Sequence, residues 1–291
     1  MTINDNFEVI PSGAALGADI VGLDLKKPIN KETFERVLDA WNEHLVLRFR
    51  NQMLTEEEFV RFSGYFGSLD DGPMVGPGHG TYHPRSAKIN VVSNIVSDGV
   101  AVGVLGNLDL AWHQDFTYKR LPPIASLLYG IETPETGDTH FCNLNSAYEN
   151  LPEELIKKIK GLSCKHDATR SLGDTVRPGF DEKYDNVSRP GAIHPLVIKH
   201  HATGKEFLFV GRRKNAWIVG LTDKESDELL DEIWAHIEDG SHHWSQRWQP
   251  DDIVLWNNRY TLHRRGELDE RQSRLLHRIQ IRDDTPPIAS L

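Results

Sequence analysis

The chain has 291 residues, of which 33 are basic and 43 acidic, so its formal net charge at pH 7 is −10. Nucleic acids and anionic membranes require a basic protein surface, so this balance argues against both as partners. A chain of this length can bury roughly three quarters of the surface that it exposes when unfolded, so its stability needs neither a disulfide nor a structural zinc ion.

The N-terminal third predicts helices and strands in alternation. Apolar residues at helical spacing from Phe34 to Trp41 predict a helix, and the segment 45–49 that follows predicts a strand. Thr55 and Glu58 have the pattern of a capping box, in which each side chain satisfies a backbone N–H of the other residue. A second helix is therefore expected to begin after Thr55, and residues 89–92 predict another strand.

The C-terminal half continues in the same manner. A short helix should follow residue 150, where Pro152 suits a first turn. Residues 207–210 predict a strand, and Thr222, followed by Glu three residues later, predicts another capped helix. The segments 253–256 and 278–281 predict two further strands.

Many short strands with a few flanking helices predict a mainly β protein, a sandwich or jelly-roll barrel decorated by helices. No repeat, low-complexity tract or long linker divides the chain, so we expect one domain over residues 1–291. The segments at about 71–88 and 166–192 contain glycine, proline and charge without periodicity. They are expected to be lid or substrate loops.

The remaining features indicate a cytoplasmic protein. The N-terminal residues lack the basic and apolar regions of a signal peptide, and no run of about eighteen apolar residues could span a membrane. Cys142 and Cys164 do not form a CxxC pair. We expect two reduced, buried thiols, although the sequence alone does not exclude a bridge between them.

The segment 111–116 carries the most chemical information. Side chains two residues apart on a strand point to the same face, so a strand here would present His113 and Asp115 to one ion. His263 is the candidate for a third ligand. Two histidines and one carboxylate on one face, with the opposite face open, are typical of Fe(II) oxygenases that activate O2. An HxD tripeptide alone is weak evidence, because the chain has 14 histidines and such a pair can arise by chance. His113 and Asp115 could also be a surface or core strand pair whose side chains satisfy each other.

The surrounding motifs identify a family. The chain contains WHxD at 112–115, GDT at 137–139 and WxNR at 256–259 ahead of His263, and Arg274 lies eleven residues beyond that histidine. In this combination and order the chain resembles the TauD/TfdA family of 2-oxoglutarate-dependent dioxygenases, from residue 13 to residue 278. The resemblance implies a double-stranded β-helix core of the jelly-roll or cupin type.

The resemblance also implies roles for individual residues. His113, Asp115 and His263 would bind Fe(II), while Arg274 and the hydroxyl of Thr139 would bind the distal carboxylate of 2-oxoglutarate. A guanidinium can pair with such a carboxylate through two parallel hydrogen bonds. O2 would be the second cosubstrate, and the reaction would release succinate and CO2 while oxidising a small-molecule substrate. Related halogenases replace the carboxylate ligand with a small residue, so Asp115 favours hydroxylation.

Three further residues are candidates for substrate binding. The arginine that matches Arg278 in taurine oxygenases holds a sulfonate, but Arg278 could equally pair with a structural carboxylate or with the near end of 2-oxoglutarate. Asp109 stands where the taurine enzyme has an asparagine, a departure that puts taurine itself in doubt. Phe116 could form an apolar wall with Tyr118, although aromatic residues in such a fold more often belong to the core.

The substrate is therefore expected to be a small organic acid, a sulfonate or an amphipathic metabolite. The cluster at 212–214 could guide an acidic substrate, but we interpret it as surface. Two other classes of protein stay open, a metal-dependent hydrolase or lyase on a similar barrel and a non-catalytic binding relative. Arg274 and Thr139 argue against the hydrolase. The family often forms dimers or tetramers, so a homo-oligomer is expected.

Overall fold

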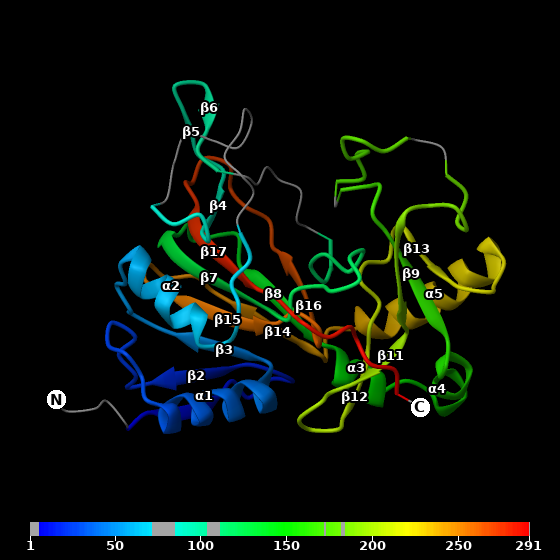
Figure 1. The fold of residues 1–291 in the computed structure, drawn as a ribbon, viewed down its shortest axis with the longest axis horizontal. Coiled ribbons are helices and arrows are strands. Elements are labelled where there is room, and N and C mark those ends of the chain that lie inside the picture. Colours follow the sequence, from blue (N-terminus) through cyan, green and yellow to red (C-terminus); the bar gives the residue numbers. More distant parts are fainter. Residues whose placement is uncertain (1–5, 72–84, 104–110, 172, 182–183, 291) are drawn as a thin grey trace.

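The computed structural model describes residues 6–71, 85–103, 111–171, 173–181 and 184–290. Two antiparallel arrays of strands lie at its centre (Figure 1). The larger is a seven-stranded sheet with the order β1 (Glu8–Pro11), β2 (Ala18–Val21), β3 (Val46–Phe49), β15 (Ile253–Asn257), β7 (Ala125–Glu132), β17 (Leu275–Ile281) and β4 (Asn90–Ser93), in which only β2 and β3 are shown paired in parallel. The smaller is a three-stranded sheet with the order β14 (His243–Gln246), β8 (Thr139–Asn143) and β16 (Thr261–Arg265).

The chain crosses between these two sheets strand by strand. β7 belongs to the larger sheet and β8 to the smaller, and β14, β15, β16 and β17 then alternate between the smaller and the larger sheet. This alternation builds a jelly roll, because each strand pairs with neighbours that are distant in sequence while its successor joins the opposite sheet. The prediction of a mainly β protein with a double-stranded β-helix core is confirmed.

Five helices occur among the described residues. They are α1 (Lys31–His44), α2 (Glu56–Gly64), α3 (Leu144–Glu149), α4 (Glu153–Ile159) and α5 (Asp223–Ile237). The capping boxes predicted at Thr55 and Thr222 are both present, which explains why α2 and α5 begin where they do. Pro152 is the N-cap of α4. The short helix α3 was not predicted; the side chain of Asn143 caps it by accepting two backbone N–H bonds.

Smaller sheets complete the fold. β10 (Gly191–Pro195), β9 (Ser163–Asp167) and β13 (Ala216–Ile218) form one of them, β11 (Val197–Lys199) pairs with β12 (Glu206–Leu208), and β5 (Val96–Ser97) pairs with β6 (Val100–Ala101). The strand predicted over residues 207–210 is wrong at its end, because β12 stops at Leu208. Beyond it the chain turns at Gly211, whose φ is +63°, and forms hydrogen bonds with Gln114.

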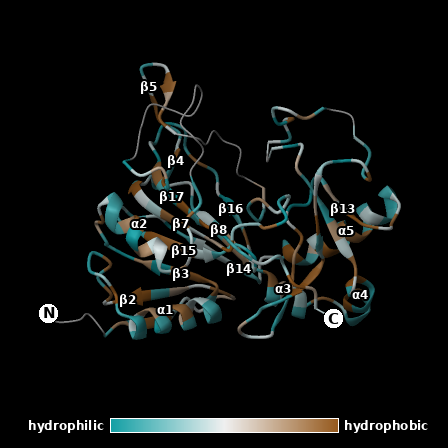
Figure 2. Cartoon of the chain, in the orientation of Figure 1, coloured by the Kyte–Doolittle hydropathy of each residue, from teal (hydrophilic) through white to brown (hydrophobic). Residues whose placement is uncertain are grey.

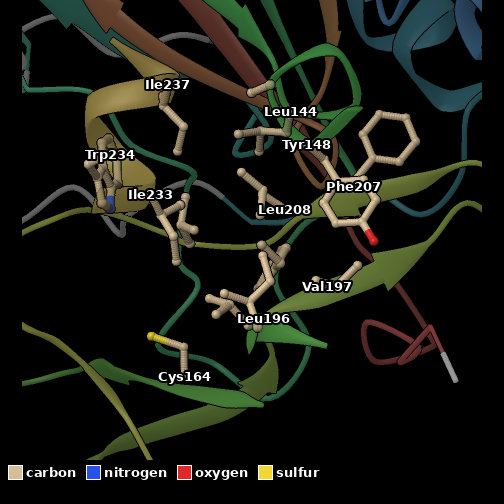
Figure 3. Close-up of a cluster of buried hydrophobic side chains, with 14 of the residues drawn as sticks. Leu144, Tyr148, Cys164, Leu196, Val197, Phe207, Leu208, Ile233, Trp234 and Ile237 are labelled. Atoms are coloured by element: carbon tan, nitrogen blue, oxygen red, sulfur yellow. The ribbon is translucent and has the colours of Figure 1, made fainter. Parts of the chain in front are cut away.

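Alternation along the strands divides the apolar residues into three clusters. On β7, Leu127 and Tyr129 face α1 and α2, whereas Leu128 packs between the two main sheets with Phe141 and Trp256. A third cluster joins α3, α4 and α5 to β11 and β12 (Figure 3). The outward faces of the helices are hydrophilic, as Figure 2 shows for α1 and α5.

The structure shows the state of the two cysteines and the character of the helices. Cys142 and Cys164 are both free and buried, and burial raises the pKa of the Cys164 thiol to about 12. In the described part of the chain, no helix has the length and apolarity that a membrane span requires. The predicted loop at 71–88 lies mostly outside the described residues, and the segment 166–192 runs from the end of β9 to the start of β10.

Candidate active site

His113 and His263 are joined through their backbones. His263 lies on β16. The backbone N–H of His113 donates to the carbonyl oxygen of His263 at 3.0 Å, and the N–H of His263 donates to the carbonyl oxygen of His113 at 2.9 Å. The prediction that one strand carries both His113 and Asp115 is wrong, because His113 forms an isolated bridge and the chain turns from Asp115 onwards. Phe116 then adopts a φ of +52°.

The side chain of Asn258 explains this turn. Its Oδ1 accepts the N–H of Asp115 at 2.8 Å, and its Nδ2 donates to the carbonyl oxygens of Asp115 at 3.1 Å and Pro123 at 2.9 Å. Gln114 adds a second link, donating to the carbonyl of Arg259 at 2.7 Å. The backbone of Asp115 is therefore fixed by side chains and not by a strand ladder.

Despite the turn, three potential ligand atoms converge. The Nε2 atoms of His113 and His263 each lie 3.7 Å from one of the two carboxylate oxygens of Asp115. Ligand atoms of the three residues all lie within 4.8 Å of one another. All three side chains are buried, being 4%, 7% and 6% exposed for His113, His263 and Asp115. Such a cluster can hold a metal ion.

Electrostatics keep Asp115 and His263 in the forms that bind metal. Burial opposes ionisation of Asp115, but Arg278 and the two histidines outweigh it, so the pKa of this carboxyl lies below its ordinary value. Burial, followed by the nearby His113, holds the pKa of His263 well below its usual range. Nδ1 of His113 lies 2.9 Å from the carbonyl oxygen of Ala111 and donates to it, so Nε2 is the ring nitrogen that faces Asp115 and is placed to bind a metal.

A second group of candidates lies beside the histidines. A small cavity of about 50 Å³ is lined by Val92, His113, Leu128, Thr139, Trp256, His263, Arg265, Arg274 and Arg278. Thr139 and His263 share the inward face of the three-stranded sheet, since Phe141 pairs with His263 and Thr139 lies two residues before it. The backbone N–H of Arg274, just before β17, donates to Oδ1 of Asn94 at 2.8 Å. The structure thus brings Thr139 and Arg274 together with two residues of the metal-binding cluster.

The substrate candidates have different outcomes. Arg278 donates to the carboxylate of Asp115 and, at 3.2 Å, to the hydroxyl of Ser126. Phe116 and Tyr118 line a second cavity of about 180 Å³, which Asp115 also lines and which shares His113 and Arg278 with the smaller cavity. Asp109 lies outside the described residues.

The structure also reveals residues whose positions the sequence did not predict. Arg212, interpreted as surface, is only partly exposed, and its guanidinium donates to the carbonyl oxygens of Ser171, Arg170 and Asp167. Nothing in the sequence signals this, because its partners are backbone atoms about forty positions earlier. Asn258 lies within the WxNR motif, but the motif alone gave it no role.

Comparison with known proteins agrees with this arrangement. The model of the family described as "Taurine catabolism dioxygenase TauD, TfdA family" matches residues 8–280. The chain is 30% identical over 284 residues to the alpha-ketoglutarate-dependent 2,4-dichlorophenoxyacetate dioxygenase of Cupriavidus pinatubonensis, covering 94% of this chain and 97% of that protein. It is 27% identical to pentalenolactone F synthase of Streptomyces arenae, covering 96% of each.

A solved structure supports the same assignment. The crystal structure of a taurine dioxygenase from Burkholderia xenovorans superposes with a TM-score of 0.78 at 30% identity, covering 96% of this chain and 90% of that one. Fold, family model and relatives therefore agree over nearly the whole length. The chain belongs to the TauD/TfdA family of 2-oxoglutarate-dependent dioxygenases.

Proposed function

We propose that this enzyme is an Fe(II)-dependent dioxygenase that uses 2-oxoglutarate and O2 to hydroxylate a small organic acid, a sulfonate or an amphipathic metabolite, with release of succinate and CO2. The observation that carries the proposal is the buried cluster of two imidazoles and one carboxylate beside a small cavity that contains Arg274 and Thr139. It supports a metal centre with an anion-binding group within reach.

The donor set of His113, Asp115 and His263 fits Fe(II). Two imidazole nitrogens and one carboxylate oxygen match the ligand preference of non-haem iron and leave open coordination positions. The low pKa of Asp115 and of His263 supports this assignment, because an ionised carboxylate and a neutral imidazole are the forms that bind a metal. When bound, the iron supplies the activation of O2.

Thr139 and Arg274 would hold the distal carboxylate of 2-oxoglutarate. Oγ1 of Thr139 accepts a hydrogen bond from Nε1 of Trp248 at 2.9 Å, so the hydroxyl proton is left to donate to another acceptor. Arg274 is 3% exposed, and a guanidinium screened from water pairs strongly with a carboxylate. A hydrolase or lyase would have no use for this anion site, and a non-catalytic relative would have no use for an intact metal-binding cluster.

The relatives support the proposed class of substrate. Two of the three proteins compared above are named for 2,4-dichlorophenoxyacetate and for taurine, which both carry an acidic group. The intact carboxylate ligand favours hydroxylation. We also propose that residues 1–291 form one domain, that the enzyme is cytoplasmic and that it assembles as a homo-oligomer.

The test is a substrate screen that measures three quantities at once. Protein loaded with Fe(II) is given 2-oxoglutarate, O2 and either 2,4-dichlorophenoxyacetate, taurine or other small acids, and succinate, O2 consumption and oxidised product are measured. We expect one class of acid to stimulate succinate formation and O2 consumption in equal amounts. The Asp115→Ala variant should show neither succinate formation nor O2 consumption with that acid. Product formed without O2 consumption would instead support the hydrolase or lyase.

A further inference from the structure

The cavity of about 180 Å³ that faces Asp115 contains three arginines, Arg177, Arg212 and Arg278. Two of them are already engaged with the protein. Arg278 donates to Asp115 and Ser126, and Arg212 donates to three backbone carbonyl oxygens. Both guanidinium groups are therefore already held in place by partners within the protein.

Arg177 differs from the other two. Its guanidinium carbon lies 4.0 Å from the centre of the Tyr118 ring, and no carboxylate of a described residue lies within ion-pairing distance of it. The backbone N–H of Arg177 donates to the carbonyl of Thr169 at 2.7 Å, which anchors this part of the segment between β9 and β10. Stacking on an aromatic ring fixes the plane of a guanidinium while its N–H edge remains able to donate.

A second residue indicates that the cavity is built for a polar ligand. His166 lines the same space and is 3% exposed, yet neither of its ring nitrogens has a hydrogen-bond partner among the described residues. Burial holds the pKa of His166 well below its usual range, so the ring is neutral and can donate one hydrogen bond and accept another. Buried polar groups without partners are rare in proteins, and a bound ligand is one way to satisfy them.

We propose that Arg177 binds the anionic group of the substrate and thereby determines its class. The substrate would be a monoanion with a carboxylate, sulfonate or sulfate, whose oxygens accept the paired N–H groups of the guanidinium. Phe116 and Tyr118 line the same cavity and provide an aromatic wall for its apolar part. The cavity is smaller than the usual ~300 Å³ and above of pockets for drug-sized ligands, so that part is a single ring or a short chain.

This inference rests on the proposed function, and its test separates the two. The Arg177→Gln variant is compared with the unmutated enzyme and with Arg271→Gln, a matched loss of charge at an exposed arginine paired with Asp269. Each protein is first loaded anaerobically with Fe(II) and 2-oxoglutarate, and the affinity for 2-oxoglutarate is measured from the visible absorption of the complex. Each loaded protein is then titrated with three anions, phenoxyacetate, pentanesulfonate and pentyl sulfate, and with the uncharged analogues phenoxyacetamide and pentanesulfonamide. The dissociation constant of each compound is measured.

We expect all three proteins to bind 2-oxoglutarate equally. At least one anion should bind Arg177→Gln about tenfold or more weakly than it binds the other two proteins, because a charged hydrogen-bonded pair is lost. The affinity for its uncharged analogue should not change, and Arg177→Lys should restore part of the affinity for the anion.

The opposite results are equally defined. The proposal would be overturned if every anion that binds the unmutated enzyme bound Arg177→Gln equally tightly, or if the unmutated enzyme bound 2-oxoglutarate but none of the anions. Failure of the unmutated enzyme to bind 2-oxoglutarate would instead overturn the proposed function.

Discussion

Replacement of Asn258 by alanine tests whether a side chain, and not a strand, positions the carboxylate at the centre of the site. Asn258 is 1% exposed and forms three hydrogen bonds, one with the N–H of Asp115 and two with the carbonyl oxygens of Asp115 and Pro123. Each costs about 1 kcal/mol when lost, and more where the remaining group stays buried, so Asn258→Ala should lower the free energy of unfolding by about 3 kcal/mol.

The matched control is Asn150→Ala. Asn150 is exposed, and its Nδ2 donates to a single backbone carbonyl, that of Ser146, at 2.8 Å. This change should cost less than about 1 kcal/mol. Urea unfolding of the metal-free proteins at equilibrium measures both values.

The same variant should also bind metal less tightly. Residues that orient a metal ligand typically contribute about 10-fold to 100-fold to metal affinity, so Mn²⁺ should bind folded Asn258→Ala at least about tenfold more weakly, as measured by calorimetry. Asn150→Ala should bind Mn²⁺ as the unmutated protein does. An Asn258→Ala protein with unchanged stability and unchanged metal affinity would refute the argument that this side chain holds Asp115.

Three further predictions concern the cosubstrate, a glycine and the pH dependence of stability. Thr139→Val keeps the shape of the side chain but removes the hydroxyl, so the dissociation constant of 2-oxoglutarate, measured anaerobically, should rise by about tenfold while that of Mn²⁺ stays constant; an unchanged value for 2-oxoglutarate would contradict the role of Thr139. Gly211→Ala would place a Cβ 2.2 Å from Nδ1 of His166, whereas Gly240→Ala, also at positive φ, meets nothing within 4 Å. Gly240→Ala should therefore cost only about 1 kcal/mol in urea unfolding and Gly211→Ala clearly more, and equal costs would refute the crowding. Burial lowers the pKa of His200 from 6.5 to about 4, so the unfolded chain binds a proton there before the folded one does. The free energy of unfolding of the metal-free protein should thus decrease as the pH falls from 6.5 to 4, and it should decrease less in His200→Gln. If the difference in unfolding free energy between the two proteins stays constant across this range, His200 is not the cause.

The sequence predicted features that depend on neighbouring residues or on motifs. The helices that begin after Thr55 and Thr222 follow from capping boxes only four residues long, and both are present. The six-residue helix α3 is too short for an apolar period to be visible, and only the cap at Asn143 could have indicated it.

The details of the site depend on contacts between distant parts of the chain. Asp115 leaves the expected strand because Asn258, 143 positions later, takes its N–H. Arg212 is only partly exposed because its guanidinium donates to carbonyl oxygens of the segment that follows β9. The sequence could therefore select the residues of the site but not the orientation of their backbones.

The central claim is that His113, Asp115 and His263 hold an iron ion to which 2-oxoglutarate binds. The measurement that tests it most directly is the visible spectrum of metal-free protein after anaerobic addition of Fe(II) and then 2-oxoglutarate. We predict a weak, lilac charge-transfer band in the unmutated protein and none in His113→Ala at the same concentrations. Absence of the band in the unmutated protein, together with no measurable binding of 2-oxoglutarate, would contradict the account.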